Sequence, residues 1–195
     1  MYDFDTLIDR RTTNSMKWEH GRAFLTPEQQ AADPLPMWVA DMDFRVAPPI
    51  LDALRKQVEM GVLGYGGTPD SYREAAVDWQ ARRFGWQARP EWLVQSPGVI
   101  SALNMAVQAF SQPGDHVLVQ TPVYFHFLHD VVNNGRRLAL APLTLDAGRY
   151  RFDPEAFEAA IQPGTRLFIL CNPHNPTGNV WTAEELLAMA TICEW

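Results

Sequence analysis

The sequence contains the stretch CNPHNPTG at positions 171–178, directly after the apolar run Leu167–Leu170. An amphipathic segment begins soon afterwards, near Thr182. A buried strand that ends in a rigid polar turn and leads into a helix is how open α/β sheets present ligand-binding groups. The prolines fix φ and remove backbone donors, so we expect the amide of Asn175 to be held in one orientation. The alternative interpretation is an ordinary Pro/Gly loop between a strand and a helix.

Composition and charge narrow the class of protein. The 195 residues are 47% hydrophobic and 20% charged, which is typical of a globular protein with a real core. The net charge is −7 without a basic run, which argues against nucleic acid or an anionic membrane as the main partner. We see no secretory signal and no apolar stretch of membrane-spanning length. Cys171 and Cys193 lack metal-ligand spacing, so we expect reduced thiols, no metal and a cytoplasmic location.

Helices and strands are predicted to alternate after an irregular N-terminal segment. Residues up to about 45 carry many large apolar side chains, which need the body of the protein or a partner subunit to cover them. Predicted helices cover 50–60, 69–84, 99–110, 122–134, 154–161 and the residues from 182 onwards, and predicted strands cover 92–95, 117–120, 138–140 and 167–170. This alternation favours an α/β fold with a mostly parallel sheet.

Three of the predicted strands are each followed by a group that suits one ligand. Gly98 opens a helix whose free N–H groups favour an anion such as phosphate, although a glycine before a helix is more often a simple turn. Tyr124 could stack on a planar ligand or pack on a helix surface. Asn175 could donate a hydrogen bond to a phenolate-like oxygen. Because parallel strands end at one edge of a sheet, we expect these groups to converge on one site.

The chain resembles the fold-type I pyridoxal phosphate (PLP) enzymes, in particular the aminotransferase-like C–S lyases of the MalY/PatB cystathionine β-lyase kind. The matching stretches are residues 14–18, 38–44, 98–100, 121–124 and 171–178. The NPTG motif is typical of the aminotransferase superfamily. The full CNPHNP form, together with VADMD at residues 39–43, is typical of the lyase branch.

The resemblance implies an aminotransferase-like three-layer α/β domain that binds PLP. It implies that backbone amides around Gly98, Val99 and Ile100 hold the cofactor phosphate. Tyr124 would stack on the pyridine ring and assist proton transfer at the substrate amine. Asn175 would donate to the phenolic oxygen of the ring.

The resemblance also implies a homodimer that acts on a small amino-acid substrate. Tyr65 would reach the phosphate held by the neighbouring subunit, and Ala40 and Asp41 would lie in the substrate-binding loop. Residues 1–49 would form an N-terminal segment that contacts the small domain or the partner. Residues 50–195 would be the first half of the PLP-binding domain.

The activity implied is β-elimination from cystathionine or a cysteine S-conjugate, which gives a thiol, pyruvate and ammonia. The family needs a Schiff-base lysine, but the only lysines here, Lys17 and Lys56, lie outside the sequence context in which the family carries it. We therefore expect the N-terminal half of such an enzyme, inactive alone, with sheet edges that leave it unstable or exchanging elements between copies. The alternatives are a class I/II aminotransferase, and a non-catalytic fragment or regulatory binding module.

Overall fold

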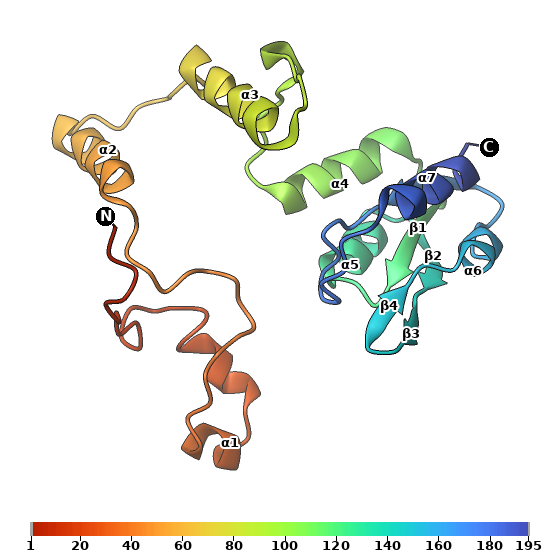
Figure 1. The fold of residues 1–195 in the computed structure, drawn as a ribbon, viewed down its shortest axis with the longest axis horizontal. Helices are drawn as coiled ribbons and strands as arrows, with labels where there is room; N and C mark the ends of the chain where they lie inside the picture. Colours follow the sequence, from red (N-terminus) through yellow and green to blue (C-terminus); the bar gives the residue numbers. More distant parts are fainter. Residues whose placement is uncertain (1, 195) are drawn as a thin grey trace. The chain divides into compact units, whose positions relative to one another are not determined.

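The computed structural model describes residues 2–194, which form two compact units (Figure 1). The first unit extends to Pro69 and the second begins at Asp70. Within the described residues, no helix is long and apolar enough to cross a membrane. The predicted domain boundary near residue 50 stays a prediction.

The first unit contains three short helices: η1 (His20–Phe24), α1 (Pro27–Ala31) and α2 (Pro48–Met60). Sequence reasoning missed η1 and α1, although α1 begins with a capping box. The Thr26 hydroxyl accepts from the Gln29 backbone, and the Gln29 side chain accepts from the Thr26 backbone. Ser15 is the only buried residue among those described in this unit. The unit therefore has no hydrophobic core of its own.

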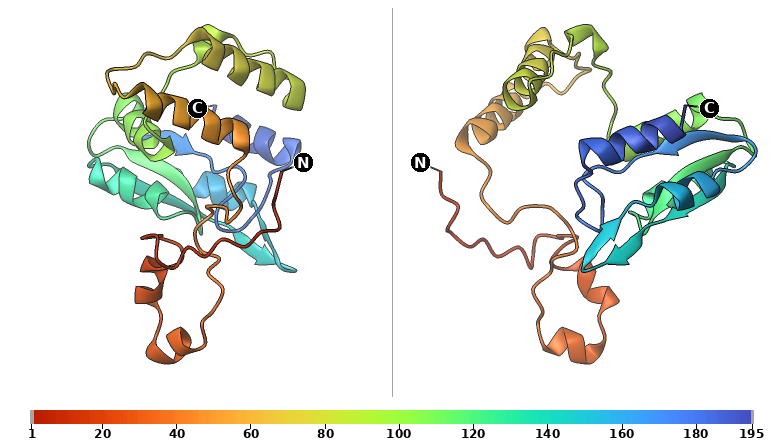
Figure 2. Two further views of the ribbon diagram at one scale, coloured as in Figure 1. Left: turned by 90° about the vertical axis from the view of Figure 1, so that its left-hand side faces the viewer. Right: turned by 45° about the vertical axis from the view of Figure 1, so that its right-hand side comes forward.

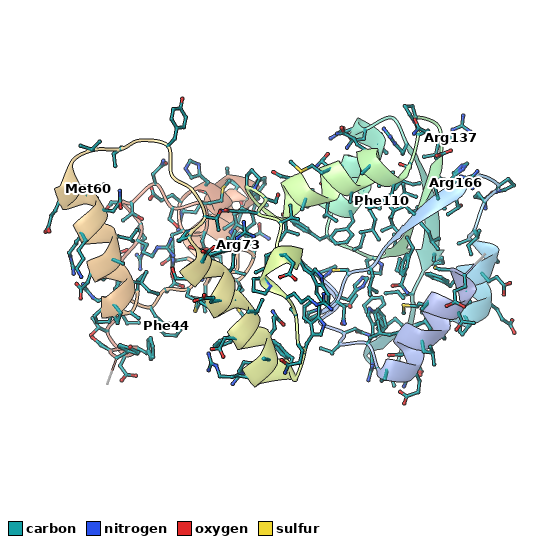
Figure 3. The ribbon with its side chains drawn as sticks, turned by 90° about the horizontal axis from the view of Figure 1, so that it is seen from above. Phe44, Met60, Arg73, Phe110, Arg137 and Arg166 are labelled. Carbon is teal, nitrogen blue, oxygen red and sulfur yellow. The ribbon has the colours of Figure 1, made fainter. Side chains whose placement is uncertain are left out.

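Helix α2 carries an apolar stripe that nothing in its own unit covers. Ile50, Leu54 and Val58 follow one another at four-residue spacing and are 55%, 59% and 73% exposed. The helix ends at Met60, labelled in Figure 3, and Gly61 takes the left-handed conformation (φ 71°) that terminates many helices. A stripe of this kind needs another surface to cover it.

The second unit holds the sheet and the remaining helices. Its helices are α3 (Asp70–Phe84), η2 (Pro90–Trp92), α4 (Val99–Phe110), α5 (His126–Asn133), α6 (Pro154–Ala159) and α7 (Ala183–Ile192), and its strands are β1 (His116–Thr121), β2 (Arg137–Pro142), β3 (Thr144–Asp146), β4 (Arg149–Arg151) and β5 (Thr165–Ile169). β1, β2 and β5 form a parallel sheet in the order β2–β1–β5. The predicted α/β class is confirmed.

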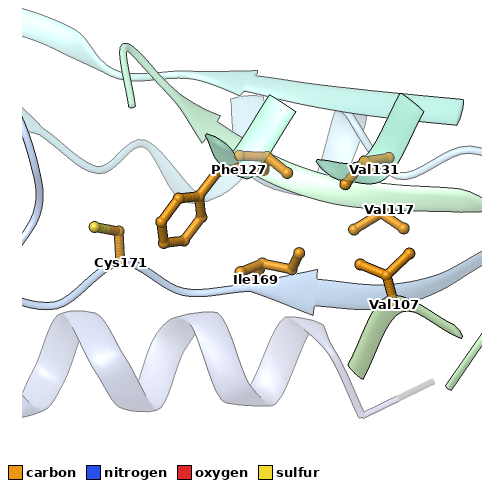
Figure 4. Close-up of a cluster of buried hydrophobic side chains, with 7 residues drawn as sticks. Val107, Val117, Phe127, Val131, Ile169 and Cys171 are labelled. Atoms are coloured by element: carbon orange, nitrogen blue, oxygen red, sulfur yellow. The ribbon is translucent and has the colours of Figure 1, made fainter. Parts of the chain in front are cut away.

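Helices cover both faces of this sheet, so the unit has three layers (Figure 2). Side chains alternate across a strand, so Val117 and Val119 of β1 face one way and Leu118 the other. The first face packs on α4 and α5 in the cluster of Val107, Val117, Val119, Phe127, Val131, Ile169 and Cys171 (Figure 4). The second face packs on α6 and α7 in the cluster of Leu118, Ala139, Ala141, Leu143, Phe157, Trp181 and Met189.

Two helices of this unit begin with the chemistry that the sequence predicts. Thr182 and Glu185 form a complete capping box at the start of α7. Asp153 accepts hydrogen bonds from two backbone N–H groups at the start of α6. Each cap satisfies donors that would otherwise be unpaired at the helix terminus.

Two predictions about local structure are wrong, and one hairpin was not predicted. Residues 92–95 do not form a strand: η2 starts at Pro90, and no neighbouring strand among the described residues pairs with the segment after it. The helix predicted from Pro122 begins only at His126, because the Tyr124 N–H is directed to another loop. The β3–β4 hairpin was missed, although Ala147 and Gly148, both at positive φ, form its turn.

Candidate cofactor site

The carboxyl edge of the sheet brings together two of the predicted ligand-binding residues. β1 ends at Thr121 and β5 ends at Ile169, so the loops that follow them leave the same edge. The backbone N–H of Tyr124, in the first loop, donates to the carbonyl of Asn175, in the second, at 2.8 Å. The structure therefore places these two residues side by side.

The stretch that follows β5 is a tightly bonded turn. The Cys171 thiol, 8% exposed, accepts from the Asn175 N–H at 3.3 Å, and the Cys171 carbonyl accepts from the Trp181 indole at 3.1 Å. Gly178 adopts φ 75°, which favours glycine, and its N–H donates to the His174 carbonyl at 2.7 Å. The peptide bonds before both prolines of this stretch are cis. The hydrogen bonds at its N–H and at its carbonyl hold the backbone of Asn175 in place.

The side chains of Tyr124 and Asn175 remain available to a ligand. No hydrogen bond joins the Tyr124 hydroxyl or the Asn175 side-chain amide to any residue that the structure describes. Tyr124 is half-buried against the α4/α5 face, and Asn175 is exposed. A ring and an amide held together by their backbones suit a planar ligand with an oxygen at its edge.

The start of α4 offers a place for an anion. No side chain caps this helix at Gly98, so the N–H groups of its first turn have no intrahelical partner. A Cβ added at Gly98 would meet no heavy atom within 4 Å, so the space beside the helix start is open. The first turn contains no acidic residue that would repel a phosphate.

The direction of α4 puts its first turn toward the carboxyl edge. At the other end of the helix, Arg136 donates two hydrogen bonds to Ser111. Its Nε donates to the Ser111 hydroxyl at 3.0 Å, and its Nη2 donates to the Ser111 carbonyl at 2.6 Å. Arg136 directly precedes β2, so α4 ends at the amino edge, where Figure 3 labels Phe110, Arg137 and Arg166. Helix and strand have similar lengths, about 18 Å and about 20 Å. Gly98, Val99 and Ile100 therefore lie toward the same edge as Tyr124 and Asn175.

The predicted substrate loop belongs to the first unit and is held by an ionic network that sequence reasoning missed. The Asp43 carboxylate accepts from Lys17 at 2.6 Å and from the Trp18 indole at 2.7 Å. Arg10 contacts Asp43 at 3.1 Å and Asp41 at 2.5 Å. The hydrogen bond from Lys17, followed by that from Trp18, lowers the pKa of Asp43 from 3.8 to about 2.

The network also fixes the backbone of the loop that contains Ala40 and Asp41. The Lys17 ammonium donates to the Asp41 carbonyl at 3.1 Å. The stretches 14–18 and 38–44 were both identified as motifs. The positive charge of Lys17 in the first and the negative charge of Asp43 in the second are the signal from which their pairing could have been predicted. Tyr65, predicted to reach the partner's phosphate, is fully exposed and makes no ring contact with another described residue.

A cavity of about 770 Å³ lies elsewhere, in the first unit. It is lined by the aromatic rings of Trp18, Phe24 and Trp38 among others. None of the predicted cofactor-binding residues lines it. We therefore assign the candidate site to the sheet edge, where polar groups converge, and not to this cavity.

Neither lysine of the chain belongs to the unit that contains the sheet edge. Lys17 is engaged with Asp43 and its side chain is 12% exposed. Lys56 is an exposed residue of α2. Both belong to the first unit, whereas Gly98, Tyr124 and Asn175 belong to the second.

A helix start, a ring and an amide at the carboxyl edge of a parallel sheet form the arrangement in which α/β folds bind phosphate-bearing ligands. The chain belongs to the class I and II aminotransferase family, whose family model matches residues 36–195. PLP is the cofactor of this family, and its solved members include PLP-bound enzymes. The open start of α4 and the unpaired groups of Tyr124 and Asn175 fit the phosphate and ring of PLP.

Within the family, the chain is similar to C–S lyases. It is 44% identical to cystathionine β-lyase PatB of Bacillus subtilis, over 98% of this chain and 49% of that protein. The PLP-bound C–S lyase of Staphylococcus hominis superimposes with a TM-score of 0.87 at 34% identity, over 100% of this chain and 49% of the other. Cystalysin of Treponema denticola superimposes with a TM-score of 0.86 at 32% identity, over 98% and 48%. The chain spans about half the length of the relatives that it matches.

Proposed function

We propose that the chain is the cofactor-holding N-terminal half of a PLP-dependent C–S β-lyase that cleaves cystathionine or cysteine S-conjugates. The observation that carries this proposal is the backbone hydrogen bond between Tyr124 and Asn175, because it brings together two residues whose side-chain polar groups are free for a ligand. Bound PLP supplies the electron sink for loss of the Cα proton and of the sulfur leaving group. The whole protein would be a homodimer in the cytoplasm.

The residues of this chain would bind and orient the cofactor. Backbone N–H groups at Gly98, Val99 and Ile100 would hold the phosphate at the positive end of α4. Tyr124 would lie against the pyridine ring and move a proton at its hydroxyl. The Asn175 side chain would donate to the ring oxygen.

The first unit would supply the substrate side and the contact with the partner subunit. Ala40 and Asp41 would line the substrate loop, whose position the Asp43 network fixes. Tyr65 would reach the phosphate of the other subunit, which accounts for a large aromatic residue that is fully exposed. The lysine that binds PLP covalently would lie beyond these 195 residues.

The deciding experiment compares elimination with amino transfer. A protein containing this chain together with the downstream half is incubated with L-cystathionine, and thiol and pyruvate are measured without added keto acid. Stoichiometric release of both supports the lyase, whereas product formation only with a keto-acid acceptor overturns it in favour of an aminotransferase.

A second measurement concerns the 195-residue chain itself. PLP is added and the mixture is reduced with borohydride, and the mass of the chain is then recorded. We expect no adduct on Lys17, because its ammonium is bound to Asp43, and the exposed Lys56 serves as the reference for the reaction of a surface lysine with PLP. A stoichiometric adduct on Lys17 would show that a lysine of this chain can hold the cofactor covalently.

A further inference from the structure

His174 is buried beside the candidate site and has no role among the predicted cofactor contacts. Only 1% of its surface is exposed. Its ring packs edge-on against Trp181, with centroids 5.5 Å apart and planes at 77°. Its backbone N–H donates to the Asn179 carbonyl at 2.7 Å. The histidine is therefore fixed within the turn that follows β5.

The ring of His174 joins this turn to the loop that follows β1. Its Nε2 lies 2.8 Å from the Pro122 carbonyl oxygen. A carbonyl can only accept, so Nε2 carries the proton and donates it. In the neutral ring, Nδ1 is then left without a proton, and it has no partner in the described part of the chain.

We propose that His174 is a positioning residue that sets the register between Tyr124 and Asn175. Two links cross between the loops: His174 to Pro122 through a side chain, and Tyr124 to Asn175 through the backbone. The two links are close together in both loops: Pro122 is two positions from Tyr124, and His174 directly precedes Asn175. Losing the side-chain link leaves the loops connected through a single backbone hydrogen bond. This inference rests on the proposed function, in which Tyr124 and Asn175 contact the same cofactor ring.

Two substitutions at this position separate the hydrogen bond from the packing. His174→Phe keeps an aromatic ring against Trp181 and removes the donor. His174→Gln keeps an N–H donor at the same number of bonds from the backbone as Nε2 and removes the ring. If the donor positions the loops, the Gln variant restores what the Phe variant loses.

The test measures amide hydrogen exchange in the 195-residue chain. In H174F we expect the Tyr124 amide to exchange about tenfold faster than in the unaltered chain, because the Pro122 carbonyl loses its donor and the loops separate more often. In H174Q the exchange rate should return to within about threefold. The Leu118 amide in β1 is the reference and should not change. Unchanged Tyr124 exchange in H174F, or equal acceleration of both amides, would overturn the proposal.

The second readout is the affinity for PLP, followed by quenching of tryptophan fluorescence. We expect the Kd to rise about tenfold in H174F and to recover in H174Q. Equal affinities in all three chains would overturn the link to the cofactor. If the unaltered chain binds no PLP, the proposed cofactor role of this chain fails, while the exchange comparison still decides whether His174 holds the two loops.

Discussion

Replacing Gln120 with methionine should make the protein more stable, although it removes a polar residue from the edge of a candidate site. Gln120 is the fifth residue of β1 and is 2% exposed. It lies on the same face of β1 as Leu118, which is the face that packs against α6 and α7. Neither its side-chain oxygen nor its nitrogen has a hydrogen-bond partner among the described residues.

The magnitude follows from the cost of burying an amide without a partner. Protein substitution data put this cost at about 1 to 3 kcal/mol. Methionine has the same chain length and no amide, so Gln120→Met should raise the free energy of unfolding by about 1 to 3 kcal/mol. Urea unfolding followed by circular dichroism measures the change. The slope of the unfolding free energy against urea concentration should stay the same.

A matched substitution provides the control. Gln108 is exposed on α4, and its side chain donates to Asn134 at 2.7 Å. Gln108→Met should lower stability by about 0.5 to 1.5 kcal/mol through the lost hydrogen bond. The prediction is that the two substitutions change the free energy of unfolding in opposite directions. A loss of more than about 1 kcal/mol in Gln120→Met would refute the reasoning, because Gln120 would then have a partner in solution.

Three further predictions test the core, the ionic network and a helix cap. Phe157→Ala removes a ring that is 1% exposed, and should cost about 3 to 5 kcal/mol in urea unfolding; a cost below about 1 kcal/mol would contradict its place in the core. The pKa of Asp43 is lowered to about 2, so its contribution to stability is complete above pH 3.8 and is lost as the pH falls through 2. The Trp18 indole N–H signal in NMR should follow that titration, and a midpoint near 4 would mean that the Lys17 contact is absent. Thr182→Ala removes the cap of α7 and should cost about 1 kcal/mol, whereas Thr182→Ser should retain most of it.

Much of the second unit could be predicted from the sequence because its signals are local. The apolar runs around Val117, Leu138 and Leu167 became the three parallel strands, and the cap at Thr182 marked the start of α7. Residues 92–95 have the composition of a strand, but a strand needs a neighbour to pair with, and composition does not say where that neighbour is. The strand prediction for residues 92–95 is therefore wrong because strand pairing depends on residues far away in the chain.

The residues of the candidate site could be proposed from the sequence, but the hydrogen bonds that connect them could not. Gly98, Tyr124 and Asn175 were identified from motifs at strand ends, and the structure turns the three toward one edge. The hydrogen bond between Tyr124 and Asn175 and the burial of His174 depend on the relative position of two loops about fifty residues apart, which no local pattern encodes. The Asp43 network was missed for the same reason, since Lys17 and Asp43 are separated by 26 positions.

The absence of a core in the first unit has a consequence for synthesis on the ribosome. In relatives twice as long, the region matching this chain emerges while the remainder is still being translated, and 195 residues take about 10 to 40 s to make. The second unit can bury both of its apolar clusters during that time, because β1, β2 and β5 are all present. The stripe of Ile50, Leu54 and Val58 cannot be covered within its own unit, so we expect nascent chains to expose it to chaperones until a later surface forms.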